Sequence, residues 1–426
     1  MKILYSAPRG TKDILPSETK IWRKIKKKAI EVSERFGFSE IIFPTFEEER
    51  LFVRSVGQET DVVQKEMFTF LDSAGRRLAL RPEGTASLVR AVIENGLLNE
   101  TLPLKLFYII NCFRNERPQK GRYKEFYQLG IELFGSSSPV GELEVISLAK
   151  MFFDELNIKN LELNINSIGC LDCRKDFVLK LMDYFKEHEN KLCKTCKERL
   201  NKNPLRILDC KEEECDMLKE NAPKILDNIC SNCKEHFNMV EKLLKNNNIN
   251  YVINHKIVRG LDYYTKTVFE FKTNELGAQD TICGGGRYDN LFEELGAKHT
   301  PALGFGVGLN RLFLILKDRE KIENCCDLYV GYISKKAMFK ACRIVSNLRE
   351  KNIKVQTDLL ERSVKAQMKY ANKINAKYSI IIGDNEINSN ECELKNMYEN
   401  QTKKFSINNF ESEFSDFFVR RGNKNF

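Results

Sequence analysis

The stretch from Lys105 to Phe134 constrains the fold of this chain more than any other segment. Two runs of strand-forming residues flank a polar loop, and this pattern predicts a long β-hairpin. Because side chains alternate between the faces of a strand, Leu129 and Ile131 of the second run should point into a core. The opposite face carries an aromatic ring, an amide, a gap and a carboxylate, namely Phe126, Gln128, Gly130 and Glu132. That face suits a planar polar ligand, although a solvated sheet face is the alternative.

Charged residues gather around the turn of this hairpin. Arg114 and Glu116 are two residues apart on the first strand and should share the polar face. The connecting loop adds four basic side chains, Arg117, Lys120, Arg122 and Lys124. A loop of this composition suits phosphate groups or nucleic acid.

A second strand-like run has three glycines two residues apart, Gly304, Gly306 and Gly308, which clear one of its faces of side chains. Such a strand weakens itself, and the cost usually marks the close approach of a ligand or of another backbone. A bulged or tightly packed strand is the alternative. Arg311 follows at an expected helix start, beside the bare face.

Three shorter segments combine glycine with charged or aromatic residues. Arg259-Gly260 precedes Tyr263-Tyr264, and the glycines at 284–286 precede Arg287-Tyr288-Asp289. Glu83-Gly84-Thr85 stands at the start of an expected helix, where Glu83 could bind an amine or the segment could serve the helix entrance. None of the glycine patterns matches a P-loop or a dinucleotide fingerprint.

Together, and in their order along the chain, the segments resemble the signature motifs of class II aminoacyl-tRNA synthetases. Residues 113–126 resemble motif 2, residues 304–311 resemble motif 3, and the helix and strand that end at Pro44 resemble motif 1. Within that class, residues 258–264 and 285–289 resemble two peptides of the histidine-specific family. The resemblance runs from about Pro8 into the C-terminal part of the chain.

The resemblance implies a site for L-histidine. Its residues would be Glu83, Gly84, Thr85, Arg114, Gln128, Glu132, Arg259, Tyr263, Tyr264 and Tyr288. Glu132 and Tyr264 should bind the two imidazole nitrogens, while Glu83, Thr85 and Gln128 should hold the α-amino group. A site that pairs both ring nitrogens rejects isosteric competitors, because these would leave buried polar groups unpaired.

The resemblance also implies a site for ATP, formed by Arg114, Glu116, Arg122, Phe126 and Arg311. Phe126 and Arg311 should cover the two faces of the adenine, and Glu116 should accept from its amino group. Arg114 and Arg259 are the expected catalytic residues, acting with Mg²⁺ at the α-phosphate. Since the histidine carboxylate is already ionised at neutral pH, the step needs placement and charge neutralisation rather than a general base.

One residue departs from the family's pattern. Asn310 stands where motif 3 usually has a glutamate, which puts a secondary contact of that motif in doubt. Two other functions are consistent with the same motifs: a regulatory paralogue that binds histidine without charging tRNA, and an RNA-binding or sensor module derived from the same fold. Regulatory paralogues usually lack the C-terminal domain and have degraded motifs, whereas both are intact in this sequence.

The expected fold is α+β with two domains. Residues 1–326 should form a class II catalytic domain, an antiparallel sheet flanked by helices, with a helical cysteine-rich insertion at about 170–250. Residues 327–426, where strands and helices alternate, resemble an α/β anticodon-binding domain. The expected partners are tRNA(His), L-histidine, ATP and a second copy of the chain, in a homodimer formed through motif 1.

Eight of the fourteen cysteines fall in the insertion, six of them as C-x-x-C pairs. The eight are Cys170, Cys173, Cys193, Cys196, Cys210, Cys215, Cys230 and Cys233. Their spacing suits a structural Zn²⁺, and unliganded thiols are the alternative.

The net charge of +9 is compatible with a polyanionic partner. No long apolar run is present, so no membrane span is expected. The start of the chain lacks the features of a secretory signal, and a cytoplasmic location is expected.

Overall fold

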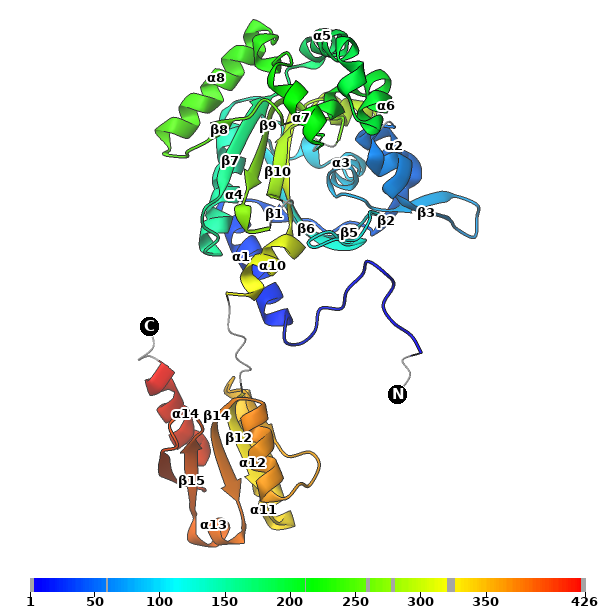
Figure 1. The fold of residues 1–426 in the computed structure, drawn as a ribbon. Helices are drawn as coiled ribbons and strands as arrows, with labels where there is room; N and C mark the ends of the chain where they lie inside the picture. The colour runs from blue at the N-terminus through cyan, green and yellow to red at the C-terminus, as the bar shows by residue number, and fades with distance from the viewer. Residues whose placement is uncertain are drawn as a thin grey trace. The chain divides into compact units, whose positions relative to one another are not determined.

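The computed structural model describes residues 4–58, 60–210, 212–257, 261–276, 280–319 and 326–422. The chain divides into two compact units, Met1–Glu320 and Lys321–Phe426 (Figure 1). Both units combine sheets with helices, so the expected α+β class is confirmed.

An eight-stranded sheet forms the centre of the large unit, in the order β1-β5-β6-β11-β10-β9-β7-β8. Its strands are β1 (Ser39–Glu40), β5 (Leu104–Phe113), β6 (Glu125–Phe134), β7 (Glu162–Ser167), β8 (Val252–Ile253), β9 (Thr265–Lys272), β10 (Thr281–Arg287) and β11 (Ala302–Gly308). The pairs β1/β5 and β7/β8 at the two edges are parallel, and every pair between them is antiparallel.

The predicted hairpin is the pair β5/β6, joined in register from Leu104↔Phe134 to Phe113↔Glu125. Leu129 and Ile131 are buried, as the alternation predicts. The placement of Arg114 and Glu116 on the first strand was wrong, because β5 ends at Phe113 and both residues lie in the connection.

Three helices pack together on the apolar face of β6 and β11: α1 (Thr19–Arg35), α4 (Val140–Glu155) and α10 (Leu309–Lys317). The ring of Trp22 on α1 lies between Tyr127 of β6 and Phe313 of α10, with centroids 5.1 and 5.5 Å away. These helices cover one face of the sheet and leave the face of Gln128 and Glu132 for the site described below.

A small antiparallel sheet, β2-β4-β3, lies beside the large one. The elements of this region are β2 (Phe46–Glu48), α2 (Glu49–Val56), η1 (Val62–Glu66), β3 (Phe68–Leu71), β4 (Arg77–Leu80), α3 (Thr85–Glu94) and η2 (Leu97–Asn99). Two short elements, η6 (Asn274–Leu276) and α9 (Leu291–Glu294), follow β9 and β10. Helix α3 begins at Thr85, where the sequence predicts a helix start, and this start carries Glu83 to the site.

The insertion is helical, as predicted. It contains α5 (Leu171–Glu187), η3 (Glu189–Lys191), α6 (Lys194–Lys202), η4 (Pro204–Ile207), α7 (Glu213–Glu220), η5 (Ile225–Asp227) and α8 (Ser231–Asn246). Its longer helices lie together at one end of the large unit, drawn in green in Figure 1. Helix α8 reaches back to pack on α4.

The small unit has a five-stranded sheet in the order β13-β12-β14-β15-β16. Its elements are β12 (Cys326–Tyr332), α11 (Lys335–Glu350), β13 (Val355–Thr357), α12 (Val364–Lys373), β14 (Ala376–Ile382), α13 (Asp384–Ser389), β15 (Glu391–Asn396), β16 (Thr402–Ser406) and α14 (Phe410–Gly422). The first three strands are parallel, as the alternation of strand and helix predicts, while β15 and β16 form an antiparallel hairpin that the sequence analysis missed. In neither unit do the described residues form a helix long and apolar enough to cross a membrane.

Candidate active site

The bare glycine face of β11 is occupied by side chains from the neighbouring strand β6. Gly304 pairs with Glu132, and a Cβ at Gly304 would lie 1.8 Å from Glu132 Oε2. A Cβ at Gly306 would lie 2.2 Å from Gln128 Nε2. The alternative of a tightly packed strand therefore holds for these two glycines, and their absent side chains let Glu132 and Gln128 lie flat over the sheet.

A third glycine makes room on β6 itself. A Cβ at Gly130 would lie 1.9 Å from Tyr108 Cζ, so the Tyr108 ring passes over the position that a side chain would fill. Gly84 accommodates the same ring from the other side, because its Cβ would lie 2.4 Å from that atom. The Tyr108 hydroxyl is thereby brought to Glu132, to which it donates at 3.3 Å.

Glu132 is the buried centre of this face. Its carboxylate also accepts from the Thr85 hydroxyl at 2.8 Å and from the Tyr288 hydroxyl. Burial raises the pKa of Glu132 to about 8, even though the hydrogen bonds from Tyr288 and Thr85 favour the charged form. In the free protein this carboxyl group is therefore mostly protonated at neutral pH.

Glu83 occupies the start of helix α3. Its two carboxylate oxygens accept from the backbone N–H groups of Thr85 and Ala86, at 2.7 and 2.8 Å. The helix-entrance alternative is thus correct, with Glu83 rather than Thr85 serving the helix. Glu83 also faces the cavity described next, and burial raises its pKa in spite of these hydrogen bonds.

These side chains surround a cavity of about 410 Å³. Eight of the residues expected for histidine line it: Glu83, Thr85, Arg114, Gln128, Glu132, Tyr263, Tyr264 and Tyr288. Gly84 is not among the lining residues. Arg259 lies outside the described residues, but the next described residue along the chain, Leu261, lines the cavity.

A second cavity, of about 190 Å³, adjoins the first. All five residues expected for ATP line it: Arg114, Glu116, Arg122, Phe126 and Arg311. The Arg114 guanidinium lies 5.5 Å from the centre of the Phe126 ring, and Arg122 Nη1 lies 3.1 Å from Glu116 Oε2. Because Arg114, Glu116 and Arg122 line both cavities, these three side chains can contact a ligand in either one.

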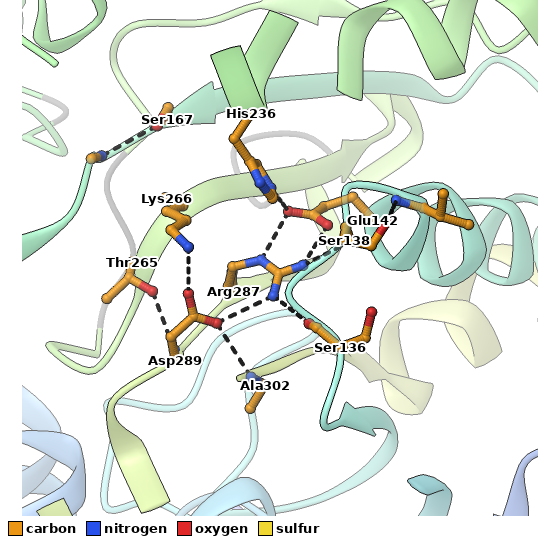
Figure 2. Close-up of polar contacts among 12 residues, drawn as sticks. Ser136, Ser138, Glu142, Ser167, His236, Thr265, Lys266, Arg287, Asp289 and Ala302 are labelled. Atoms are coloured by element: carbon orange, nitrogen blue, oxygen red, sulfur yellow. Dashed lines mark hydrogen bonds and ion pairs between the residues drawn. The ribbon is translucent and has the colours of Figure 1, made fainter. Parts of the chain in front are cut away.

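A buried ion network supports the wall that carries Tyr288 (Figure 2). Glu142 of α4 accepts from Arg287 and from the His236 ring of α8, each at 2.6 Å. Arg287 also donates to Asp289 at 3.2 Å, so both neighbours of Tyr288 along the chain are fixed. Burial alone would raise the pKa of Glu142, but the His236 hydrogen bond and the charge of Arg287 outweigh it and lower the pKa to about 2.

Five charged residues of the first cavity were missed by the sequence analysis: Asp61, Glu66, Arg199, Arg206 and Asp209. They come from the η1 region and from the insertion, which share no motif with the rest of the site. Arg206 stands between two apolar residues, Leu205 and Ile207, and that interruption is the one signal the sequence offered.

Asn310, the departure from motif 3, has a defined contact. Its side-chain oxygen accepts from the backbone N–H of Tyr127 at 2.7 Å, and this bond ties the start of α10 to β6. At this position, where motif 3 usually has a carboxylate, an amide oxygen accepts the hydrogen bond.

Comparison with known proteins agrees with this geometry. A family model described as histidyl-tRNA synthetase matches residues 10–312, and one described as an anticodon-binding domain matches residues 327–416. The chain is 49% identical to the histidine–tRNA ligase of Acetivibrio thermocellus over 95% of its length and 98% of that protein, and 46% identical to that of Clostridioides difficile over 93% and 95%. The crystal structure of apo S. aureus histidyl-tRNA synthetase has a TM-score of 0.81 at 33% identity, covering 96% of this chain and all of that one. The chain therefore belongs to the histidyl-tRNA synthetase family.

Proposed function

We propose that the residues lining the two cavities carry out the reaction of this family, the ATP-dependent attachment of L-histidine to tRNA(His) through a histidyl-adenylate. The activity itself follows from family membership. The assignment of residues rests on one observation, that polar side chains from segments far apart in the sequence line two cavities which share Arg114, Glu116 and Arg122.

The first cavity is proposed to bind histidine, with Glu132 at its imidazole ring. An ionised carboxylate has about four acceptor positions, and hydroxyl groups of Thr85, Tyr108 and Tyr288 occupy three of them. One position is left for a ring N–H. Tyr264 lines the same cavity and is proposed to donate to the other ring nitrogen, so the ring would be bound in its neutral form.

The α-amino group is proposed to lie between Glu83, Thr85 and Gln128. Each oxygen of Glu83 accepts one backbone N–H, which leaves acceptor capacity for an ammonium group. A cation placed there would favour the ionised form of Glu83, whose pKa burial raises in the free protein.

The second cavity is proposed to bind ATP, with the adenine between Phe126 and Arg311 and its amino group at Glu116. Arg114 would meet both the histidine carboxylate and the α-phosphate, since it lines both cavities. Arg259 is proposed as the second catalytic arginine. Two guanidinium groups would neutralise the charge that develops at the α-phosphorus, while the bound carboxylate attacks in line and the bond to the leaving pyrophosphate breaks.

Mg²⁺ is proposed to accompany ATP. Glu66 lines the first cavity, and hard carboxylate oxygens are the ligands that Mg²⁺ takes. Burial, and then the negative charge of Glu116, raise the pKa of Glu66, and a bound cation would favour its ionised form. When bound there, Mg²⁺ would neutralise phosphate charge.

A second copy of the chain is proposed as a partner. Large apolar side chains are exposed at the end of motif 1 and just after it, among them Ile42 at 85% and Phe46 at 51%. Phe46 lies 6.2 Å, between ring centroids, from Phe70, which is also exposed, so they form a patch. An exposed patch of this kind favours a protein interface. Sedimentation analysis of the purified chain distinguishes the homodimer from a monomer.

The two domains are proposed to have separate functions. Residues 1–326 would be the catalytic domain and residues 327–426 would bind the anticodon of tRNA(His), in agreement with the two family models. Because charged tRNA is used by ribosomes, the cytoplasm is the proposed location. A structural Zn²⁺ is also proposed in the cysteine-rich insertion.

Pyrophosphate exchange tests the assignment. The purified chain should exchange pyrophosphate into ATP when L-histidine is added, and not with other amino acids. A regulatory paralogue or a binding module would bind histidine without exchange. Arg114→Ala should abolish exchange, because this residue is proposed to contact both substrates; normal exchange in that variant would reject the assignment of the two cavities.

A further inference from the structure

The eight cysteines of the insertion form two separate sets of four. One set is Cys170, Cys173, Cys230 and Cys233, and the other is Cys193, Cys196, Cys210 and Cys215. Within each set, all four sulfur atoms lie within 4.8 Å of one another. The two members of each C-x-x-C pair thus stay together, and the first set joins the two ends of the insertion, whereas the second lies within residues 193–215.

The distances fit a single metal ion in each set. Tetrahedral Zn²⁺ with Zn–S bonds of about 2.3 Å holds its sulfurs about 3.8 Å apart. The Sγ atoms of Cys170 and Cys173 are 3.5 Å apart, and those of Cys193 and Cys210 are 3.9 Å apart. Both separations are far longer than a disulfide bond, and all eight cysteines are unbridged.

The backbone presents the sulfurs in a repeated manner. Cys170, Cys193 and Cys230 are the N-cap residues of α5, α6 and α8, and the second cysteine of each pair falls in the first turn. Backbone N–H groups point at sulfur atoms, from Cys230 to Cys173 at 3.1 Å and from Cys193 to Cys215 at 3.3 Å. Helix N-termini and N–H donors stabilise thiolates, the form in which cysteine binds metal.

We propose that the insertion binds two structural zinc ions, one in each four-cysteine set, and that the second set holds Arg199 and Arg206 in the wall of the first cavity. Four sulfur ligands without an open position characterise a structural zinc site rather than a catalytic one. The metal sites stand independently of the proposed function, whereas the role of the two arginines rests on it.

The second set encloses the segment that reaches the cavity. Arg199 follows Cys196 by one helical turn, and Arg206 and Asp209 precede Cys210. Both guanidinium groups lie 3.4 Å from Asp61 Oδ2, at the start of η1. Closing the segment at both of its ends on one ion would fix where these side chains lie, because the helices α6 and α7 are only nine and eight residues long.

Asn203 gives the same segment a second contact with the site. Its amide donates to Oδ1 of Asp262 at 3.2 Å, and Asp262 precedes Tyr264 by two residues. The η1 segment in turn touches motif 2, since the carbonyl of Glu66 accepts from the backbone N–H of Asn115 at 2.7 Å. The second set is therefore connected through Arg199 and Arg206 to the residues that follow Arg114.

The first set connects the two ends of the insertion, at the starts of α5 and α8. Arg174, next to Cys173, donates to the backbone carbonyls of Asp262 and Tyr264, each at 3.1 Å. A Cβ at Gly169 would lie 2.6 Å from Cys173 Cβ, and Gly169 has a φ of +67°, so only glycine suits the turn that begins this set. Cys230 closes the set from the other end of the insertion, at the start of α8.

Metal content tests the two sites directly. The full chain, purified without chelator, is analysed by elemental analysis and by native mass spectrometry, and again after stripping and reloading with Zn²⁺. We expect two zinc ions per chain. Reloading with Co²⁺ should give the visible spectrum of tetrahedral sulfur coordination, a measurement that needs no variant. One zinc ion or fewer per chain after reloading would overturn the proposal.

Paired variants test which cysteines share an ion. Cys193→Ser with Cys196→Ser should leave one zinc ion per chain, and so should Cys170→Ser with Cys173→Ser. Cys342→Ser, an exposed cysteine of the small unit, is the matched control and should keep both ions. If either paired variant retained two zinc ions, the division into these two sets would be wrong. Far-ultraviolet circular dichroism shows whether each variant is folded.

Exchange kinetics test the role of the second set. In the Cys193→Ser/Cys196→Ser variant, kcat/KM for histidine should fall about tenfold or more, because small displacements of a site wall are costly. In the Arg206→Ala variant, kcat/KM for histidine should fall by a similar factor while both zinc ions are retained. The Arg206→Lys variant should recover part of this loss. A loss below about twofold in Arg206→Ala would overturn the role of this arginine. Absence of exchange in the unmodified chain would instead reject the proposed function and leave the zinc count unaffected.

Discussion

The guanidinium of Arg287 and the carboxylate of Glu142 form a fully buried ion pair, with Nη2 2.6 Å from Oε2, across 145 residues of sequence (Figure 2). The pair joins the end of β10 to helix α4. Tyr288, the next residue, donates to Glu132 and is thereby held at the first cavity. The wall of this cavity and helix α4 are coupled through these two side chains.

Glu142→Gln should lower the free energy of unfolding by about 3–5 kcal/mol at neutral pH, because it leaves Arg287 buried without its countercharge. The pKa of Glu142 falls from 4.5 to about 2 on folding. Its contribution is therefore complete above pH 4.5 and is lost as the pH falls towards 2. Urea unfolding across this range measures both effects.

Glu155→Gln is the control for this change, since Glu155 ends the same helix. Its ion pairs with Lys28 and Arg35 are partly exposed, so its removal should change stability much less. Equal losses in the two variants would show that burial of the Arg287 pair has no special weight.

Histidine binding should release one proton between about pH 6.5 and pH 8, where the free imidazole ring is already mostly neutral. Glu132 is mostly protonated in the free protein, because its pKa is about 8, and must ionise to accept a ring N–H. The affinity should then rise with pH, by about tenfold per unit, and level off once Glu132 is ionised beforehand. Calorimetry in two buffers of different ionisation enthalpy counts the protons. Binding without proton release between neutral pH and pH 8 would mean that the ring is bound as a cation.

The Glu132→Gln variant separates this effect from general changes of the site. It should weaken histidine binding and abolish the proton release, while KM for ATP stays nearly unchanged, since Glu132 does not line the second cavity. Comparable losses for both ligands would contradict the assignment of Glu132.

Gly306→Ala should raise KM for histidine by about tenfold with little loss of stability. The new methyl group would lie 2.2 Å from Gln128 Nε2, the free end of a side chain that can rotate away. Gly308→Ala is the matched control, because its Cβ would lie 3.9 Å from Arg311 in ordinary contact. Steady-state exchange kinetics decide; an equal KM in the two variants would remove Gln128 from the histidine site.

Arg259→Ala should reduce adenylate formation by about 10²–10³-fold, because its charge would matter most in the transition state. Histidine binding should change much less. Pyrophosphate exchange and equilibrium binding, measured on the same preparation, separate the two effects. A loss of exchange below about fivefold would show that Arg259 is not a catalytic arginine.

The sequence by itself determined the local elements and the two sides of the central hairpin. Alternation between strand faces is fixed by backbone geometry, so it separated Leu129 and Ile131 from Gln128 and Glu132 before any contact was known. The motifs likewise predicted residues for histidine and ATP, most of which line the two cavities. The strand end at Phe113 was misjudged, because termini depend on pairing partners rather than on local preference.

Only the tertiary structure decided which distant segments meet. Spacing shows that Cys193 and Cys196 form a pair, but the chain path places them with Cys210 and Cys215 rather than with Cys230 and Cys233. In the same way, Glu142 became the partner of Arg287, and Arg199 and Arg206 reached the cavity from the insertion. The contacts of Glu142 with Arg287 and of Arg199 with Asp61 arise from packing across more than 100 residues, and no local pattern in a single sequence encodes them.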